Sequence, residues 1–260
     1  MIDQLISLTP VKKHPKTTEF DKSISAAFLS IIGLLTLVSC AISPTYYPEE
    51  AQTPLFTNKH QLIASLSVNG VERGYSGNLA YAITDQYFLA GKYSVSRFSN
   101  CRTCTTSIRD YGEFSMGKFN LSNDLNLTEM LVGLGKAKSE SYDVLPFSEE
   151  DIPLAKSNYY RVFVQGNWSN RKTNFKKSFA LRAVYLYLNN YIELDDIDQD
   201  ITPSGSNSSL FLEPSGTLSY WMGNYFLKGQ LGFSLPINYG NKFRHDWVWL
   251  VAKVGYRFDF

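Results

Sequence analysis

The sequence predicts an all-β protein, folded as a single up-and-down antiparallel β-barrel that crosses a membrane. The last segment alternates without a break, and one face carries only apolar side chains: Val248, Leu250, Ala252, Val254, Tyr256, Phe258 and Phe260. A tilted membrane-crossing strand needs about 9 to 11 residues of such alternation. A strand of a soluble sandwich can alternate in the same way, so the prediction depends on the rest of the chain.

Composition supports the barrel. Aromatic residues make up 15% of the chain and charged residues 19%, while the mean hydropathy is slightly negative at −0.18. Half of each barrel strand faces a polar lumen, which lowers the average, and the outer face carries two aromatic girdles. This combination excludes a helical membrane protein.

The first 39 residues are predicted to be a cleaved signal peptide. The apolar run 24–38 is too short to span a membrane comfortably, and Lys12, Lys13, Lys16 and Lys22 precede it. The sequence Leu37-Val38-Ser39-Cys40 resembles the lipobox of bacterial lipoproteins, which implies cleavage before Cys40 and lipidation of its sulfur and amino group. A plain cleaved signal or an uncleaved anchor is the alternative.

Residues 40–60 contain three prolines and are predicted to form an extended tether, and residues 61–260 the barrel. Ten runs with period two follow. They are 61–69, 74–84, 86–98, 109–120, 125–138, 158–168, 175–193, 210–222, 225–235 and 247–260. An eight-stranded barrel without the first two runs is the alternative. Pro214 is awkward inside the eighth run, because proline cannot donate to a ladder, and predicts a loop rim or a bulge there.

The connections between these runs alternate between short and longer. Outer-membrane barrels have short periplasmic turns and longer extracellular loops. The short set is 85, 121–124, 169–174 and 223–224, and the longer set is 70–73, 99–108, 139–157, 195–209 and 236–246. An even strand number returns both ends of the barrel to one side. Cys40 and Phe260 are therefore both expected on the periplasmic side, with the tether running from the inner leaflet to the first strand.

Eight charged residues within the runs are assigned to the face opposite the apolar stripe and are predicted to point into the lumen. They are Lys92, Glu113, Glu129, Arg161, Arg182, Glu213, Lys228 and Lys253. Buried charges are tolerated when they are paired, so we expect ion-pair networks that fill a narrow interior. A pathway for ions or solutes lined by these charges is the alternative.

The remaining cysteines, Cys101 and Cys104, form a C-R-T-C sequence that favours a local disulfide in a compartment outside the cytosol. The chain has only three histidines and no metal-ligand spacing, so neither a metal nor a cofactor is expected. Without residues 1–39 the chain carries 21 basic and 21 acidic side chains. A net charge near zero argues against a nucleic-acid partner.

Three short motifs carry a resemblance to a known group of proteins. They are C-x-x-S-P-x-Y-x-P at 40–48, T-P-L-F at 53–56 and A-Y-A-I-T-D at 80–85. With them the chain resembles small outer-membrane β-barrel lipoproteins of Gram-negative bacteria, whose function is uncharacterised. The resemblance implies an outer-membrane location with a lipid anchor on the periplasmic side. The implied partners are the lipid bilayer and the barrel-assembly machinery, which would recognise the C-terminal strand ending at Phe260.

The expected role is structural or surface-binding through the extracellular loops, without catalysis. A narrow channel is the first alternative. The second is a surface protease, because ten-stranded barrels resemble the omptin proteases, whose activity resides in acidic residues and a histidine on outer loops. Here His245-Asp246 and the loop residues Asp195, Asp196 and Asp198 would supply the groups, but their spacing does not match the Asp-x-Asp and Asp-x-His pairs of that family.

Overall fold

The computed structural model describes residues 46–70, 74–100, 105–122, 126–143, 152–170, 173–194, 201–204, 207–238, 245 and 247–260. The chain divides into a unit Met1–Val38 and a unit Ser39–Phe260, and all described residues belong to the second. Among these described residues, no helix is long and apolar enough to cross a membrane.

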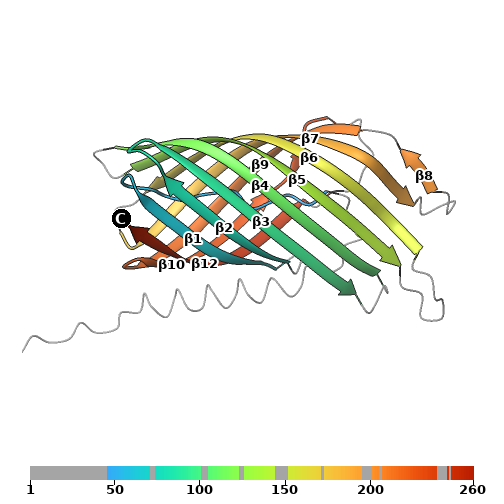
Figure 1. Ribbon diagram of the computed structural model, residues 1–260, viewed down its shortest axis with the longest axis horizontal. Coiled ribbons are helices and arrows are strands. Elements are labelled where there is room, and N and C mark those ends of the chain that lie inside the picture. The colour runs from blue at the N-terminus through green and yellow to red at the C-terminus, as the bar shows by residue number, and fades with distance from the viewer. Residues whose placement is uncertain are drawn as a thin grey trace, which may run out of the picture. The chain divides into compact units, whose positions relative to one another are not determined.

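Ten long strands form a closed antiparallel barrel, seen in Figure 1 as a cylinder of strongly tilted arrows. Two short strands, β8 (Ile201–Ser204) and β11 (Leu235–Pro236), extend its edge. The long strands are β1 (Gln61–Asn69), β2 (Gly74–Ala82), β3 (Tyr87–Asn100), β4 (Thr105–Leu121), β5 (Asn126–Asp143), β6 (Ile152–Asn170), β7 (Phe175–Leu194), β9 (Asn207–Met222), β10 (Tyr225–Phe233) and β12 (Val248–Asp259).

The last strand closes the barrel against the first. β12 pairs with the whole of β1, with Leu62 opposite Phe258. Each of the other long strands pairs with the long strands that precede and follow it, so β7 pairs with β9 and β10 with β12. The predicted fold class is confirmed, with ten strands rather than eight. The first two runs are both strands of the wall, because β1 and β2 pair as a hairpin from Leu62 opposite Tyr81 to Asn69 opposite Gly74.

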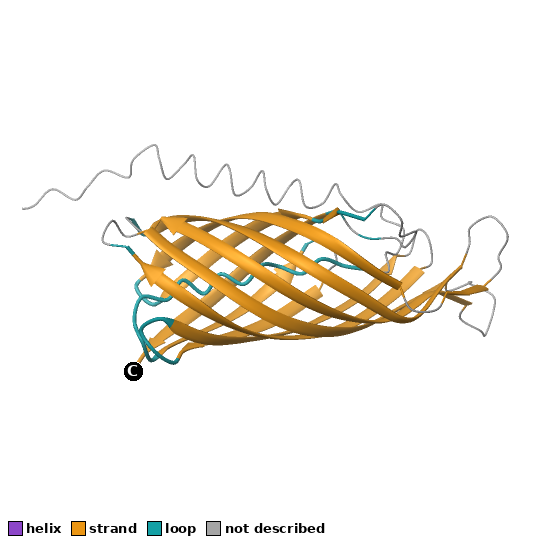
Figure 2. Ribbon diagram, turned by 90° about the horizontal axis from the view of Figure 1, so that it is seen from above, coloured by secondary structure: helices purple, strands orange, loops and turns teal. Residues whose placement is uncertain are grey.

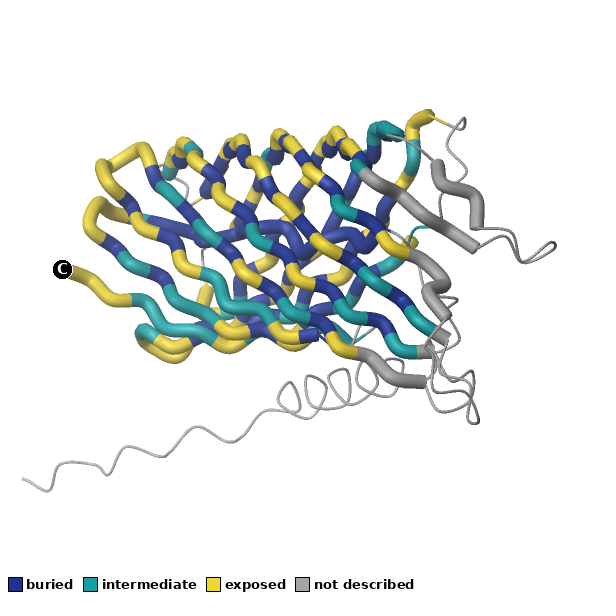
Figure 3. The backbone as a smooth tube through the Cα atoms, turned by 45° about the vertical axis from the view of Figure 1, so that its right-hand side comes forward, coloured by how far each residue is buried: buried dark blue, intermediate teal, exposed yellow. Residues whose placement is uncertain are grey.

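The outer surface has an apolar belt between aromatic side chains. Exposed aromatics lie near both ends of a single strand in β2, where Tyr75 and Tyr81 each stand one residue from an end, and Trp168 lies near the end of β6. Figure 3 shows the resulting alternation of exposed and buried positions around the wall. Apolar and aromatic side chains outside and polar ones inside are the pattern of a barrel in lipid.

The two ends of the barrel differ. We call the edge that joins β2 to β3, β4 to β5, β6 to β7 and β9 to β10, where Phe260 also lies, the turn end. The opposite edge is the loop end. Strands β3 to β7 continue toward the loop end beyond the predicted runs, and the expected loop 99–108 is mostly a hairpin in which Asn100 pairs with Thr105. Backbone pairing continues past the apolar belt because the ladder does not require apolar side chains.

Pro214 lies within β9 and not in a loop. Its neighbour in β7 is Leu181, and the β7–β9 register is unbroken there. The other side of β9 is interrupted, since pairing with β10 stops at Ser215 and pairing with β11 begins at Leu212. The predicted irregularity is therefore a gap in the pairing of β9 between β10 and β11. Pro214 lies in this gap, where its missing N–H costs no ladder hydrogen bond.

Several inward-facing glycines lie directly under aromatic rings of a neighbouring strand. A Cβ at Gly133 would overlap the ring of Phe163, and a Cβ at Gly232 would overlap the indole of Trp249. Both rings are almost fully buried. The absence of a side chain at these two positions lets the rings lie flat against the wall, which brings the lumen contents close to it.

We expect Gly232→Ala to destabilise the barrel by about 1–3 kcal/mol, because the added methyl group displaces a packed indole. The measurement is urea unfolding of the reconstituted protein. Gly229→Ala, on the same strand but with no atom within 4 Å of the added Cβ, is the matched control. It should change the free energy of unfolding by less than about 0.5 kcal/mol, and equal effects of the two changes would contradict the packing argument.

Candidate functional site in the barrel lumen

The lumen holds a segment of the same chain. Residues 46–56, here called the lumen segment, are all buried. Figure 2 shows them as a loop (teal) that runs through the inside of the barrel. Tyr46 forms an isolated parallel bridge with His245, close to the start of β12 at the loop end. Phe56 lies at the turn end, from which the chain bends into β1. The segment therefore passes through the lumen from the loop end to the turn end.

Aromatic contacts anchor both ends of the lumen segment. Toward the loop end, the ring centroid of Tyr46 lies 5.6 Å from that of Tyr159 and 4.8 Å from that of Phe211. At the turn end, the Phe56 centroid lies 5.3 Å from that of Phe88 and 5.7 Å from that of Phe119. Such pairs add packing energy beyond area burial, so each end of the segment is fixed against the wall.

Two adjacent carboxylates provide the polar middle of the segment. Glu49 forms ion pairs with Lys92 and, at 3.0 Å, with Arg109. Glu50 lies 3.0 Å from the Lys253 ammonium and 3.6 Å from that of Lys92. Its Oε1 also accepts hydrogen bonds from three wall side chains, Ser67, Ser76 and Asn78, each at 3.0 Å.

Wall side chains donate hydrogen bonds to five successive backbone carbonyls of the segment. The Arg182 guanidinium donates to the carbonyl oxygens of residues 49 and 50. Gln230 donates to that of residue 51 at 3.3 Å, and Lys228 to that of residue 53 at 2.6 Å. Gln165 and Asn167 both donate to the carbonyl of residue 52, at 2.6 and 2.8 Å. The wall thus contacts an extended backbone as well as its charged side chains.

The next contacts hold the segment near the turn end. The Gln52 amide donates to Glu113 at 2.6 Å and accepts from Ser115 at 2.8 Å. The backbone N–H of Leu55 donates to Glu129 at 2.8 Å. Leu55 has φ of 64°, a left-handed conformation that residues other than glycine rarely adopt. The contact with a buried carboxylate helps to hold it there.

A second ionic cluster lies within the wall itself. Glu213 receives a hydrogen bond from Arg182 Nε at 2.8 Å and from Arg161 Nη2 at 3.4 Å, and the Tyr46 hydroxyl donates to it at 2.6 Å. The side chains of Arg161, Arg182 and Glu213 have no exposed surface. Because both guanidinium groups are removed from water, their charges are compensated mainly by this one carboxylate, and its loss would be strongly destabilising.

All eight charged residues that the alternation assigns to the lumen have side chains turned inward. Only Arg161, Arg182 and Glu213 pair with one another; Lys92 and Lys253 pair with the lumen segment, and Glu113, Glu129 and Lys228 hydrogen-bond to it. Sequence reasoning left out Arg109, Gln165, Asn167 and Lys176. The same alternation could have found them, since Arg109 lies on the face of Glu113 and Asn167 on that of Arg161.

No pattern in the sequence indicated that Glu49 and Glu50 form ion pairs with the wall of the lumen. The region 40–60 was expected to be only a tether, because prolines and a lack of periodicity are typical of linkers. From Tyr46 to Phe56 it is extended, but it fills the lumen. The two ends of the barrel do lie on one side, as the even strand number predicts, since Gln61 pairs with Asp259. Residues 46–56, however, reach that side through the lumen and not along the outside of the barrel.

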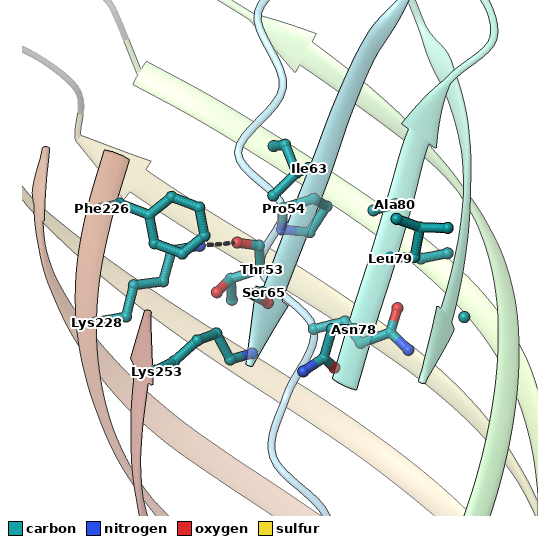
Figure 4. A pocket seen from close by; sticks show the side chains of 13 residues that line it. Thr53, Pro54, Ile63, Ser65, Asn78, Leu79, Ala80, Phe226, Lys228 and Lys253 are labelled. Atoms are coloured by element: carbon teal, nitrogen blue, oxygen red, sulfur yellow. Dashed lines mark hydrogen bonds between the residues drawn. The ribbon is translucent and has the colours of Figure 1, made fainter. Parts of the chain in front are cut away.

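A cavity of about 30 Å³ remains beside the segment, lined by Thr53, Pro54, Asn78, Lys228 and Lys253 among others. Figure 4 shows both ammonium groups directed toward it, with Lys228 bonded to the Thr53 carbonyl. This volume holds no more than about two water molecules, so no passage for solutes is left at this point. Among the described residues, no group of His, Cys, Asp and Glu could hold a metal ion.

The groups considered for catalysis are only partly described. The His245 ring packs against Phe211 and Trp247, with centroids 5.2 and 4.7 Å apart, next to the lumen segment. Asp246 and the acidic residues Asp195, Asp196 and Asp198 lie outside the described residues, as do Cys40, Cys101 and Cys104.

No model of a known protein family matches the chain, and no curated protein matches it. Among solved structures it is similar to the translocator domain of autotransporter NalP from Neisseria meningitidis. The TM-score is 0.51, with 12% sequence identity over 93% of this chain and 98% of that chain. At this identity the likeness shows the fold alone, a closed ten-stranded antiparallel barrel of the outer-membrane type.

Proposed function

We propose that this protein is a sealed outer-membrane barrel with a structural or surface-binding role, which it performs with the loop end facing outward. The observation that carries the proposal is the lumen segment, which occupies the interior from one end to the other. A lumen filled in this way offers no pathway for ions or solutes, which favours a structural or binding role over a channel. The strands β4 to β7, 17 to 20 residues long, form a wall that extends toward the loop end and offers a binding surface there.

The described part of this wall carries an exposed ionic cluster. Glu140 lies 3.0 Å from Lys138 and 3.1 Å from Lys156, and the Tyr142 hydroxyl donates to it at 2.6 Å. The lysine side chains remain about half exposed, at 56% and 48%. Polar side chains at this height agree with a surface in water above the apolar belt.

Labelling of intact cells with a membrane-impermeant amine reagent tests the orientation. Lys138 and Lys156 should be modified, whereas Lys59 and Lys118, which are exposed at the turn end, should react only after lysis. Mass spectrometry of the peptides gives the readout, and the two turn-end lysines are the internal control. Modification of Lys59 and Lys118 in intact cells, with protection of the loop-end pair, would contradict the proposed orientation.

We also propose that Cys40 carries the lipid anchor. The even strand number predicts a periplasmic Cys40 only if the chain reaches β1 without crossing the lumen. Because the lumen segment begins at Tyr46, toward the loop end, we propose that the anchor attaches at the loop end of the barrel. A Cys101–Cys104 disulfide remains part of the proposal.

Labelling with a radioactive fatty acid tests the anchor. The wild-type protein should incorporate the label, and Cys40→Ala should abolish incorporation, because alanine has no sulfur to carry the lipid. Cys101→Ala is the matched control and should retain the label. Equal labelling of the wild type and Cys40→Ala would exclude the anchor.

The proposal includes no catalytic activity. His245 contacts aromatic rings and the lumen segment, which gives it a packing role. Hydrolysis of peptides by the purified, refolded protein, lost in His245→Ala, would instead support the protease alternative. Recognition by the barrel-assembly machinery is proposed through β12, where Phe258 and Phe260 are exposed at the chain end.

A further inference from the structure

The lumen segment is not part of the hydrogen-bonded wall. The ten-stranded ladder closes through β1 and β12. Among the described residues, the bridge between Tyr46 and His245 is the one place where the backbone of the segment pairs with another part of the backbone. The other contacts described above are made by wall side chains reaching inward. A barrel with this architecture can form its complete ladder whether or not the lumen is filled.

The contacts have the form of a peptide-binding site. Five successive carbonyls receive wall donors, which recognises an extended backbone whatever its side chains are. Specificity comes from two carboxylates, which meet Lys92, Arg109 and Lys253, and from an aromatic ring six positions later in the pocket of Phe88 and Phe119. Between these features, Ala51 has no polar side chain, and its carbonyl oxygen accepts the hydrogen bond from Gln230.

The charge of the wall also requires an acidic occupant. Among the described lumen residues, the wall contributes seven cationic side chains and three carboxylates. The cations are Lys92, Arg109, Arg161, Lys176, Arg182, Lys228 and Lys253, and the carboxylates are Glu113, Glu129 and Glu213. Glu49 and Glu50 supply two of the missing negative charges. Buried ion pairs depend on both partners being present, so an empty lumen attracts acidic peptide.

We propose that the lumen is a binding site for an extended acidic peptide, which residues 46–56 occupy in cis and which can accept a segment of the same kind in trans. The ligand class is an extended chain with two adjacent acidic residues and an aromatic residue six positions toward its C-terminus. The segment is thus a bound ligand that is tethered to its own receptor.

The first test uses a variant that lacks residues 46–56, refolded in detergent, with folding established by heat-modifiable migration on gels. A fluorescent synthetic peptide of residues 44–58 should bind in a fluorescence-anisotropy titration. The same peptide with both glutamates changed to glutamine should bind at least about tenfold more weakly, since close charge pairs couple strongly. A scrambled peptide of identical composition is the second control.

A double-mutant cycle separates specific pairing from general charge attraction. Lys92→Gln together with Lys253→Gln in the wall should weaken binding of the native peptide but hardly affect the glutamine peptide. Equal weakening of both peptides, or no binding of the native peptide to the folded variant, would overturn the proposal.

A second variant keeps the proposal testable if the deletion prevents folding. A protease site inserted between Asn58 and Lys59, in the exposed turn before β1, allows the segment to be cut in the folded full-length protein. The cut segment should exchange with excess labelled peptide, and faster at high salt, because its ion pairs are then screened. A cut segment that never exchanges in either salt condition would show that it is an integral part of the fold.

Discussion

Deletion of residues 46–56 is expected to convert a silent barrel into an anion-preferring pore. The wild type should give no conductance steps in a planar bilayer, because the segment runs through the lumen and the two cavities described beside it measure only about 30 and 20 Å³. Without the segment, seven cationic side chains and three carboxylates of the wall face the open lumen among the described residues. A pore lined by an excess of positive charge concentrates anions.

The measurement is the reversal potential of single-channel currents in a potassium chloride gradient. A second variant sharpens it: Lys228→Gln and Lys253→Gln in the deletion background leave five cations against three carboxylates and should lower the preference for chloride. Addition of the 44–58 peptide should block the current. A deletion variant that is folded but silent would contradict the prediction and show that the wall side chains close the lumen without the segment.

Replacement of Glu213 by glutamine is expected to cause the largest loss of stability of any single change considered. The carboxylate accepts hydrogen bonds from Arg161, Arg182 and Tyr46, and neither guanidinium has exposed surface. Glutamine keeps the size of the side chain but leaves two cations without their shared counter-charge. Removal of one partner from a buried ionic cluster costs roughly 3–5 kcal/mol.

Urea unfolding of the reconstituted protein measures the effect, with gel migration as a second readout. Glu140→Gln is the matched control, because this carboxylate also contacts two cations, Lys138 and Lys156, but at the partly exposed loop end. Its loss should cost at most about 1 kcal/mol. A free energy of unfolding for Glu213→Gln within about 1 kcal/mol of the wild type would show that water or another group compensates the arginines.

The strands and their faces could be predicted from the sequence because alternation is a local property. Each residue's side relative to its neighbours follows from the backbone pleat, so Lys92 and Arg182 could be assigned to the lumen without knowing their partners. The strand ends were less predictable. The pairing of Asn100 with Thr105 continues beyond the apolar belt, where polar residues leave no periodic signal.

The binding arrangement of the lumen could not be predicted in the same way. Glu49 meets Lys92 and Arg109, Glu50 meets Lys253, and Thr53 meets Lys228, which are far apart in the chain and on different strands. Closure of the barrel brings them around one axis. A short region containing prolines carries no pattern that distinguishes a tether outside the barrel from a segment within it.

By itself, the sequence determined a membrane barrel with an apolar outside, a charged inside and a terminal strand that closes against the first, since each of these follows from side-chain alternation along single strands. Only the tertiary structure decided what fills the barrel. The lumen segment is held by side chains from many strands at once, and their convergence exists only after the sheet has closed. That is why Glu49 and Glu50, which lie in a region without periodicity, could not be recognised from the sequence as occupants of the lumen.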